Sequence, residues 1–187
     1  MSITAGNYNA LILLDNGTVV ECGYEPGDDK ALISGETTNH LMCFDGQTVS
    51  NVISVATWRS GAWALKADHT VVGWGDTASA SGSSNIVAIS KGRLGLTEGG
   101  LVKDLVTGAC LSDMSNVVAI ASGGGDLDHN LFLNSQGIVT SFGKYTTYSE
   151  GMPPAKINGA LSVSAGWNHS LALLPNGTVM GLSLIHI

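Results

Sequence analysis

Six copies of a short repeat constrain the fold of this chain more than any other feature of its sequence. Each copy has an apolar segment, a glycine-rich loop, a second apolar segment, a tight turn and a third apolar segment that contains valine. These valines are Val19, Val49, Val71, Val102, Val139 and Val179. Their spacing runs from 22 residues (Val49 to Val71) to 40 residues (Val139 to Val179). Repeats of this length are typical of stacked or radial architectures.

The apolar segments have the periodicity of β-strands. In the stretch SLALL, Leu171 and Leu173 flank the small residue Ala172, which is the alternation expected of a pleated strand. The turns that follow, DNGT at 15–18 and PNGT at 175–178, contain Asn-Gly. That pair predicts a type I′ turn with positive φ at both central residues, so the second and third segments are expected to form a hairpin.

The repeats predict an all-β chain. No segment has a convincing helical period, and Gly108 weakens the one candidate, at 101–115. A three-stranded repeat cannot bury both its faces alone, whereas repeats stacked around an axis can. We therefore expect a β-propeller of about six short, irregular units, complete or open. Its core is predicted to hold the leucines of the middle strands, namely Leu11, Leu13, Leu65, Leu131, Leu133, Leu171 and Leu173.

Two of these segments carry a resemblance to a known family. AGWNHSLALLPNGTVMG (165–181) and TVVGWG (70–75) resemble the repeats of the regulator-of-chromosome-condensation family, which folds as a β-propeller. Four of the six copies match well, and the short spacing is more like that of bacterial or phage members. The family includes a nucleotide-exchange factor for a small GTPase and secreted inhibitors of β-lactamases. The resemblance thus implies a protein-binding propeller and leaves the partner undefined.

The repeat pattern breaks at Leu182. Leu182 and Ser183 stand where the third repeat has Trp74 and Gly75. The last six residues, LSLIHI, resemble the translation of a transposon-end adapter used to prepare DNA libraries. We therefore expect residues 1–181 to be propeller repeats and residues 182–187 to be a non-native tail on a truncated, metagenomic fragment.

Composition excludes several classes of partner. Lys and Arg number 8 against 15 Asp and Glu, a formal net charge of −7. An acidic chain lacks the basic footprint of a nucleic-acid binder and the basic patch that holds proteins to anionic membranes. Three scattered cysteines without a CxxC pair predict neither a zinc site nor a disulfide framework. We see no signal peptide or membrane-spanning segment in this sequence, so localisation stays open.

No catalytic motif stands out, so we predict no catalytic residue, metal or cofactor. His129 and His169 occupy matching positions in separate repeats, where a structural hydrogen bond is a better explanation than a metal site. Asp126 and Asp128 are spaced like calcium ligands, but the further oxygen ligands of such a loop are missing.

The loops after the first strands carry the best candidates for binding. They contain aromatic and polar residues of the kind found in interaction hot spots: Tyr8, Trp58, Arg59, Trp167 and Asn168. We call these five residues the rim. They either bind a partner or pack onto neighbouring loops. The sequence therefore favours a non-catalytic interaction module that binds a protein or another macromolecule. The alternatives are an enzyme with a site at the propeller mouth, and a structural module of a surface or phage tail protein.

Overall fold

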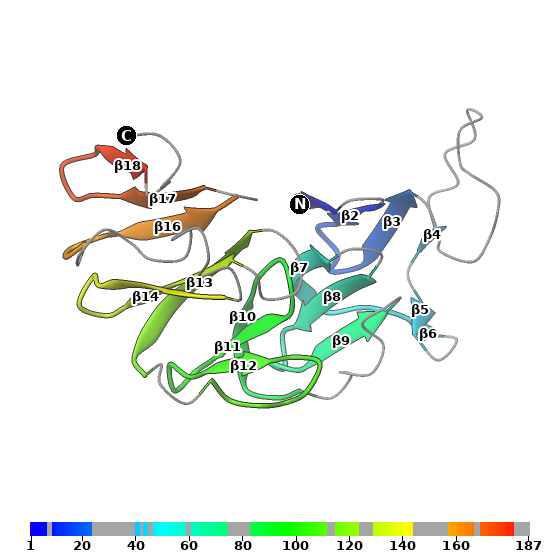
Figure 1. The fold of residues 1–187 in the computed structure, drawn as a ribbon. Coiled ribbons are helices and arrows are strands. Elements are labelled where there is room, and N and C mark those ends of the chain that lie inside the picture. Colours follow the sequence, from blue (N-terminus) through cyan, green and yellow to red (C-terminus); the bar gives the residue numbers. More distant parts are fainter. Residues whose placement is uncertain are drawn as a thin grey trace. The chain divides into compact units, whose positions relative to one another are not determined.

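The computed structural model is built from short antiparallel strands (Figure 1). It describes residues 1–6, 9–23, 40–41, 43–44, 47–58, 61–74, 83–111, 115–123, 129–143, 157–166 and 169–181. All regular elements in these ranges are strands, which confirms the all-β prediction. Within the same ranges no helix is long and apolar enough to cross a membrane. The chain forms two compact parts, an N-terminal part of Met1–Ile89 with Leu105–Gly108 and a C-terminal part of Ser90–Asp104 with Ala109–Ile187.

The N-terminal part holds the first sheets. One antiparallel sheet has the order β1 (Ser2–Ala5), β2 (Asn9–Leu13), β3 (Val19–Gly23) and β4 (His40–Leu41). The short strands β5 (Cys43–Phe44) and β6 (Gln47–Thr48) form a pair. A second large sheet has the order β7 (Val52–Trp58), β8 (Gly61–Lys66) and β9 (Val71–Trp74). Strand β10 (Ile86–Ile89) packs against β7 and β8.

The C-terminal part repeats the pattern. Strand β11 (Leu94–Thr97) pairs with β12 (Val102–Asp104). Two three-stranded sheets follow, β13 (Val117–Gly123) with β14 (His129–Asn134) and β15 (Val139–Phe142), and β16 (Ser162–Ala165) with β17 (Ser170–Leu173) and β18 (Val179–Gly181). Strand β16 lies beside β13 (Figure 1). Each sheet is a meander, as the repeat pattern predicts.

The hairpin turns form where they were predicted, but their type differs. In the first turn the amide of Gly17 donates to the carbonyl of Leu14 (3.0 Å), and only Gly17 has a positive φ, of 77°. The type I′ prediction is therefore wrong, because Asn16 does not have a positive φ. A single left-handed residue after two right-handed ones is the three-residue hairpin loop with a bulge.

The side chain before the left-handed residue explains why this turn is preferred. Oδ1 of Asn16 accepts hydrogen bonds from the amide (3.1 Å) and hydroxyl (2.7 Å) of Thr18. Asp68 bonds Thr70 in the same way, and these bonds hold the pKa of Asp68 below its ordinary value. Asn16 thus acts as a hydrogen-bond acceptor within the turn.

The sheets pack with large side chains against small ones. In the N-terminal part Leu11, Leu13 and Val19 of the first sheet share one core with Ala62 and Ala64 of β8. In the C-terminal part Leu131, Leu133 and Val139 share a core with residues of the last sheet, of which Ala172 is fully buried and Val163 and Ala165 are half-buried. Alternate residues of each middle strand point to opposite faces, so Ala62 and Ala64 of β8 lie on the face opposite Trp63 and Leu65.

The core prediction is confirmed for five of the seven leucines and is wrong for two. Leu11, Leu13, Leu65, Leu131 and Leu133 are buried, but Leu171 and Leu173 are exposed. In the last sheet Ala172 faces the core shared with β14, so the two leucines beside it face the other way. No described residue covers that face.

A backbone hydrogen bond links each turn to the following repeat. In the N-terminal part, the amide of Val52 donates to the carbonyl of Gly17 (3.0 Å) and that of Ile86 to the carbonyl of His69 (3.0 Å). In the C-terminal part, the amide of Val117 donates to the carbonyl of Gly100 (3.1 Å) and that of Ala160 to the carbonyl of Gly137 (3.0 Å). The residue before each donor has a positive φ. We call these four preceding residues the entry residues; they are Asn51, Asn85, Asn116 and Gly159. Each bond stays within one part of the chain, and each ties a hairpin to the start of the next repeat.

Candidate interaction site

Most of the rim lies outside the described residues. Tyr8, Arg59, Trp167 and Asn168 belong to ranges that the structure does not describe. Trp58 is the last residue of β7, where its backbone pairs with Gly61 of β8. This position at the end of a first strand agrees with the predicted place of the loop. The role of the five rim residues stays a prediction.

One loop of this class is described, between β10 and β11. Its residues are Ser90, Lys91, Gly92 and Arg93. The hydroxyls of Ser90 and Ser122 are buried and lie 2.7 Å apart, and a Cβ on Gly92 would be 3.5 Å from the Cβ of Ser122. This loop of the fourth repeat thus contacts the end of β13, where the corresponding loop of the fifth repeat begins.

The described residues at the starts of the next two loops, Gly123 and Gly166, also lie close together. A Cβ on Gly123 would collide with the carbonyl of Gly166, so only glycine allows the two backbones to come this close. On the other side of the loops, Nε2 of His129 lies 2.6 Å from Oγ of Ser170, and both residues are buried. The starts and ends of the loops at 124–128 and 167–168 are therefore fixed by contacts between neighbouring sheets.

The histidine bond supports the structural explanation of these residues. His129 hydrogen-bonds Ser170, which stands one residue after the matching His169 in the next repeat. His169 itself is exposed. Among the described residues no three His, Cys, Asp or Glu side chains gather as metal ligands.

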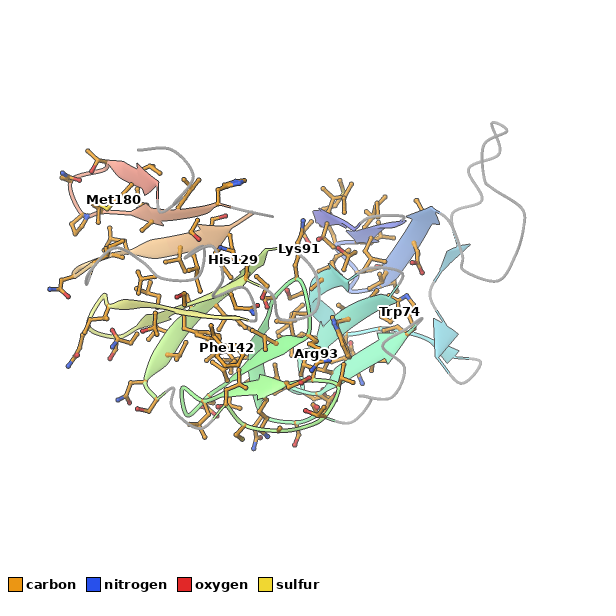
Figure 2. All side chains as sticks on the ribbon, viewed as in Figure 1. Trp74, Lys91, Arg93, His129, Phe142 and Met180 are labelled. Atoms are coloured by element: carbon orange, nitrogen blue, oxygen red, sulfur yellow. The ribbon has the colours of Figure 1, made fainter. Side chains whose placement is uncertain are left out.

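Sequence reasoning missed the two cations of the described loop. Lys91 and Arg93 are labelled in Figure 2. Lys91 is exposed, and a terminal nitrogen of Arg93 lies 2.6 Å from Oδ2 of the buried Asp104. Arg93 is therefore held in an ion pair, whereas Lys91 is the exposed charge of the loop. Both cations, like Arg59, lie between the first and second strands of a repeat. That position could have identified them as candidate binding residues.

Comparison with a family model supports the repeat assignment. The model described as the regulator of chromosome condensation repeat matches residues 161–181. These residues form β16–β18 with the turn between β17 and β18. A comparison with curated protein sequences finds no match.

Solved structures share the fold at low identity. Human WBSCR16 is similar with a TM-score of 0.70 and 18% identity, over 97% of this chain and 61% of that protein. Prp20p from Saccharomyces cerevisiae is similar with a TM-score of 0.63 and 17% identity, over 96% of this chain and 57% of that one. The CRINKLY WD40 ectodomain of the Arabidopsis thaliana receptor kinase ACR4 has a TM-score of 0.65 and 16% identity, over 97% and 64%.

The chain spans 57–64% of the length of these three structures. Identities below 20% carry the fold and not the activity. The meander sheets, the matched repeat at 161–181 and the solved structures agree. Residues 161–181 therefore match a repeat of the regulator of chromosome condensation type, and the chain as a whole has the sheets of a β-propeller fold.

Proposed function

We propose that the chain is a non-catalytic interaction module that binds another protein through its rim. The observation that carries this proposal is the packing of loop ends in the C-terminal part. There Ser90 contacts Ser122, and Gly123 contacts Gly166, so the described ends of corresponding loops in consecutive repeats lie close together. Stacked repeats generally use such a series of loops as one extended surface.

The residue types of these loops suit protein recognition. Tryptophan offers a large contact area and loses little side-chain entropy, and Trp and Arg are enriched at hot spots. Arg59 and the exposed Lys91 stand on corresponding loops of a chain with a net charge of −7. Local positive charge in an acidic molecule favours a partner with an acidic patch, because complementary charges speed association and select partners.

A solved relative supports a binding role. The Prp20p structure is described together with its binding to Gsp1p and histones. Those partners belong to Prp20p, and at 17% identity they do not transfer residue by residue. They support the broader proposal that this fold presents loops to other proteins.

The test compares the two ends of one strand. A binding partner is first obtained with the full chain from the source organism, and its affinity is measured for Trp58→Ala and for Ile53→Ala, an exposed control at the opposite end of β7. Trp58→Ala should weaken binding by at least about 2 kcal/mol, roughly thirtyfold in Kd, because it removes a central aromatic contact. Ile53→Ala should leave the Kd unchanged.

The stability of the Trp58→Ala variant distinguishes a role of Trp58 in binding from a role in packing between loops. If Trp58 contacts only the partner, its substitution leaves the urea midpoint near that of the parent chain. A large loss of stability together with an unchanged Kd would assign Trp58 to the packing between loops and contradict the proposal. Trp167→Ala, measured the same way, tests the loop between β16 and β17 separately.

A further inference from the structure

Three Asn-Gly dipeptides lie among the described residues, at 16–17, 158–159 and 176–177. Asparagine deamidates most readily before glycine, because glycine has no side chain to hinder its own amide nitrogen as that nitrogen approaches the asparagine side chain. The glycine nitrogen attacks Cγ of the asparagine, so both groups must be able to move toward each other. The three dipeptides differ in how firmly the structure holds these two groups.

The dipeptides at 16–17 and 176–177 are held in hairpin turns. Oδ1 of Asn16 accepts hydrogen bonds from the amide and the hydroxyl of Thr18, and the amide of Gly17 donates to the carbonyl of Leu14. The turn at 174–178 repeats all three bonds, at 3.0, 2.7 and 2.9 Å. In both turns these bonds must open before the glycine nitrogen can reach Cγ.

The dipeptide at 158–159 lies outside the hairpin turns, just before β16. Asn158 is exposed, and a Cβ on Gly159 would meet nothing within 4 Å, so the space beside the dipeptide is open. Among the described residues, none forms a hydrogen bond with the side chain of Asn158, and none accepts one from the amide of Gly159. The two reacting groups can therefore approach each other without first breaking such bonds.

The chain on both sides of this dipeptide is anchored in a core. Ile157 and Ala160 are both buried and belong to the core that contains leucines of β14. The amide of Ala160 donates to the carbonyl of Gly137 at 3.0 Å, and a Cβ on Gly137 would lie 2.6 Å from Cα of Gly159. The main chain between the two buried side chains therefore lies directly against the preceding turn.

We propose that Asn158 is a site of spontaneous deamidation, and that its isoaspartate product loosens the packing of the last sheet on the sheet before it. The amide nitrogen of Gly159 loses its proton and attacks Cγ of Asn158. The N–Cγ bond forms, the Cγ–Nδ2 bond breaks, and the side-chain NH2 group leaves with that proton as ammonia. Water then opens the succinimide ring: its hydroxyl adds to one ring carbonyl carbon, and its hydrogen returns to the nitrogen of Gly159.

The two products differ in the length of main chain that they leave. Opening at the side-chain carbonyl gives aspartate, which keeps the original peptide bond. Opening at the main-chain carbonyl gives isoaspartate, in which the main chain runs through Cβ and Cγ and is longer by one carbon atom. Because Ile157 and Ala160 are both buried and Gly159 lies against Gly137, the added atom displaces the main chain at this contact. Isoaspartate should therefore weaken the bond from Ala160 to Gly137, whereas aspartate should not.

The first measurement compares the three sites in the folded and in the unfolded chain. The full chain is incubated at neutral pH with and without guanidinium chloride, and peptide mapping by mass spectrometry follows each dipeptide. In the folded chain Asn158 should deamidate at least about tenfold faster than Asn16 or Asn176, because the turn bonds must first open at those two sites. In the denaturant the three rates should become similar. Thr18→Val removes one turn bond, so it should speed up Asn16 and leave the rate at Asn158 unchanged.

The second measurement tests the effect of each product. Aged chain is separated by chromatography into its aspartate and isoaspartate forms at residue 158, and hydrogen exchange of the Ala160 amide and the urea midpoint are measured for each form. In the isoaspartate form this amide should exchange at least about tenfold faster, and the midpoint should fall, because the bond to Gly137 is weakened. The aspartate form and the Asn158→Asp variant should match the fresh chain.

Asn158→Gln is the matched control for ageing. It keeps the side-chain amide but adds a methylene, so ring closure on Gly159 would need a larger ring and is much slower. The aged variant should keep the urea midpoint of the fresh chain.

Three outcomes would overturn the proposal. The first is deamidation of Asn158 in the folded chain that is as slow as that of Asn16 and Asn176. The second is an isoaspartate form in which Ala160 exchange and the urea midpoint equal those of the fresh chain. The third is an aged Asn158→Gln variant that loses as much stability as the aged parent chain, since the loss would then come from another site.

Discussion

The left-handed residue at the end of each hairpin turn has two roles. It closes the turn, and in four of the five described turns its carbonyl receives an amide at the start of the next repeat. Glycine fills this position in four of these five turns because it adopts positive φ without steric cost, and His69 fills it with a φ of 65° in the fifth. The cost of a side chain here depends on what lies opposite the turn.

Gly137 and Gly177 separate the cost of a left-handed conformation from the cost of a steric clash of the added Cβ. Gly177→Ala should destabilise the chain by about 1–2 kcal/mol, the cost of a left-handed conformation for alanine. Gly137→Ala should cost more, since its Cβ would also lie 2.6 Å from Cα of Gly159 and displace the backbone there. Urea denaturation of both variants gives the difference. Equal losses would mean that the backbone at Gly159 moves aside freely.

At this scale the sequence predicted the position of the turns but not their type. Asn-Gly correctly marks the hairpins at 15–18 and 175–178. The type I′ prediction failed because the side chain of Asn16 accepts hydrogen bonds from Thr18, and this arrangement holds with only Gly17 at positive φ. The threonine after Asn-Gly indicates this turn type, because it donates hydrogen bonds to the asparagine side chain. The turn propensity of the Asn-Gly dipeptide alone does not include this contribution.

At the scale of the element, a strand's neighbours decide which of its residues are core. Both β14 and β17 carry leucines at alternate positions, and both were predicted to be buried. The alternation gives the two faces of the strand correctly. The alternation does not predict which face of the strand is buried. Burial depends on the neighbouring sheet that packs against the strand and not on the strand's own residues.

Leu131 and Leu171 test this difference between matching positions. Leu131→Ala should cost about 2–5 kcal/mol, since Leu131 is buried in a core closed by Ala172. Leu171→Ala should cost less in this chain, because 38% of this residue is already exposed to water. Thermal or urea unfolding of the two variants measures both values. A loss at Leu171 as large as that at Leu131 would contradict the exposure of this face.

At the scale of the whole molecule, the repeats and the alternation of their strands predicted the fold class, and the residues at 165–181 and 70–75 carried the family resemblance. The rim was predicted from the position of its loops and the types of their residues. Loop side chains are held by few regular hydrogen bonds, so the sequence pattern that fixes the strands does not fix them. The ion pair of Arg93 with Asp104 illustrates this, because it joins a loop residue to a strand residue that no repeat pattern connects.

The tail gives a prediction at the level of the gene. We propose that residues 182–187, which lie outside the described residues, are not native, because LSLIHI replaces the Trp-Gly that ends the third repeat. In that repeat the indole N–H of Trp74 donates to Glu21 of the first sheet at 3.0 Å, so this tryptophan ties its sheet to an earlier one. Sequencing the genomic locus should show a sequence other than LSLIHI after Gly181. Finding LSLIHI there, followed by a stop codon, would contradict this.

The bonds between each turn and the next repeat also bear on how such a chain evolves. Donor and acceptor are both main-chain atoms. The bond between two repeats therefore requires only a residue that tolerates positive φ in the turn and another just before the donor. A duplicated repeat therefore arrives with its connection already made, and no pair of side chains has to change in step. Substitutions elsewhere in the repeat can then accumulate without loosening this connection.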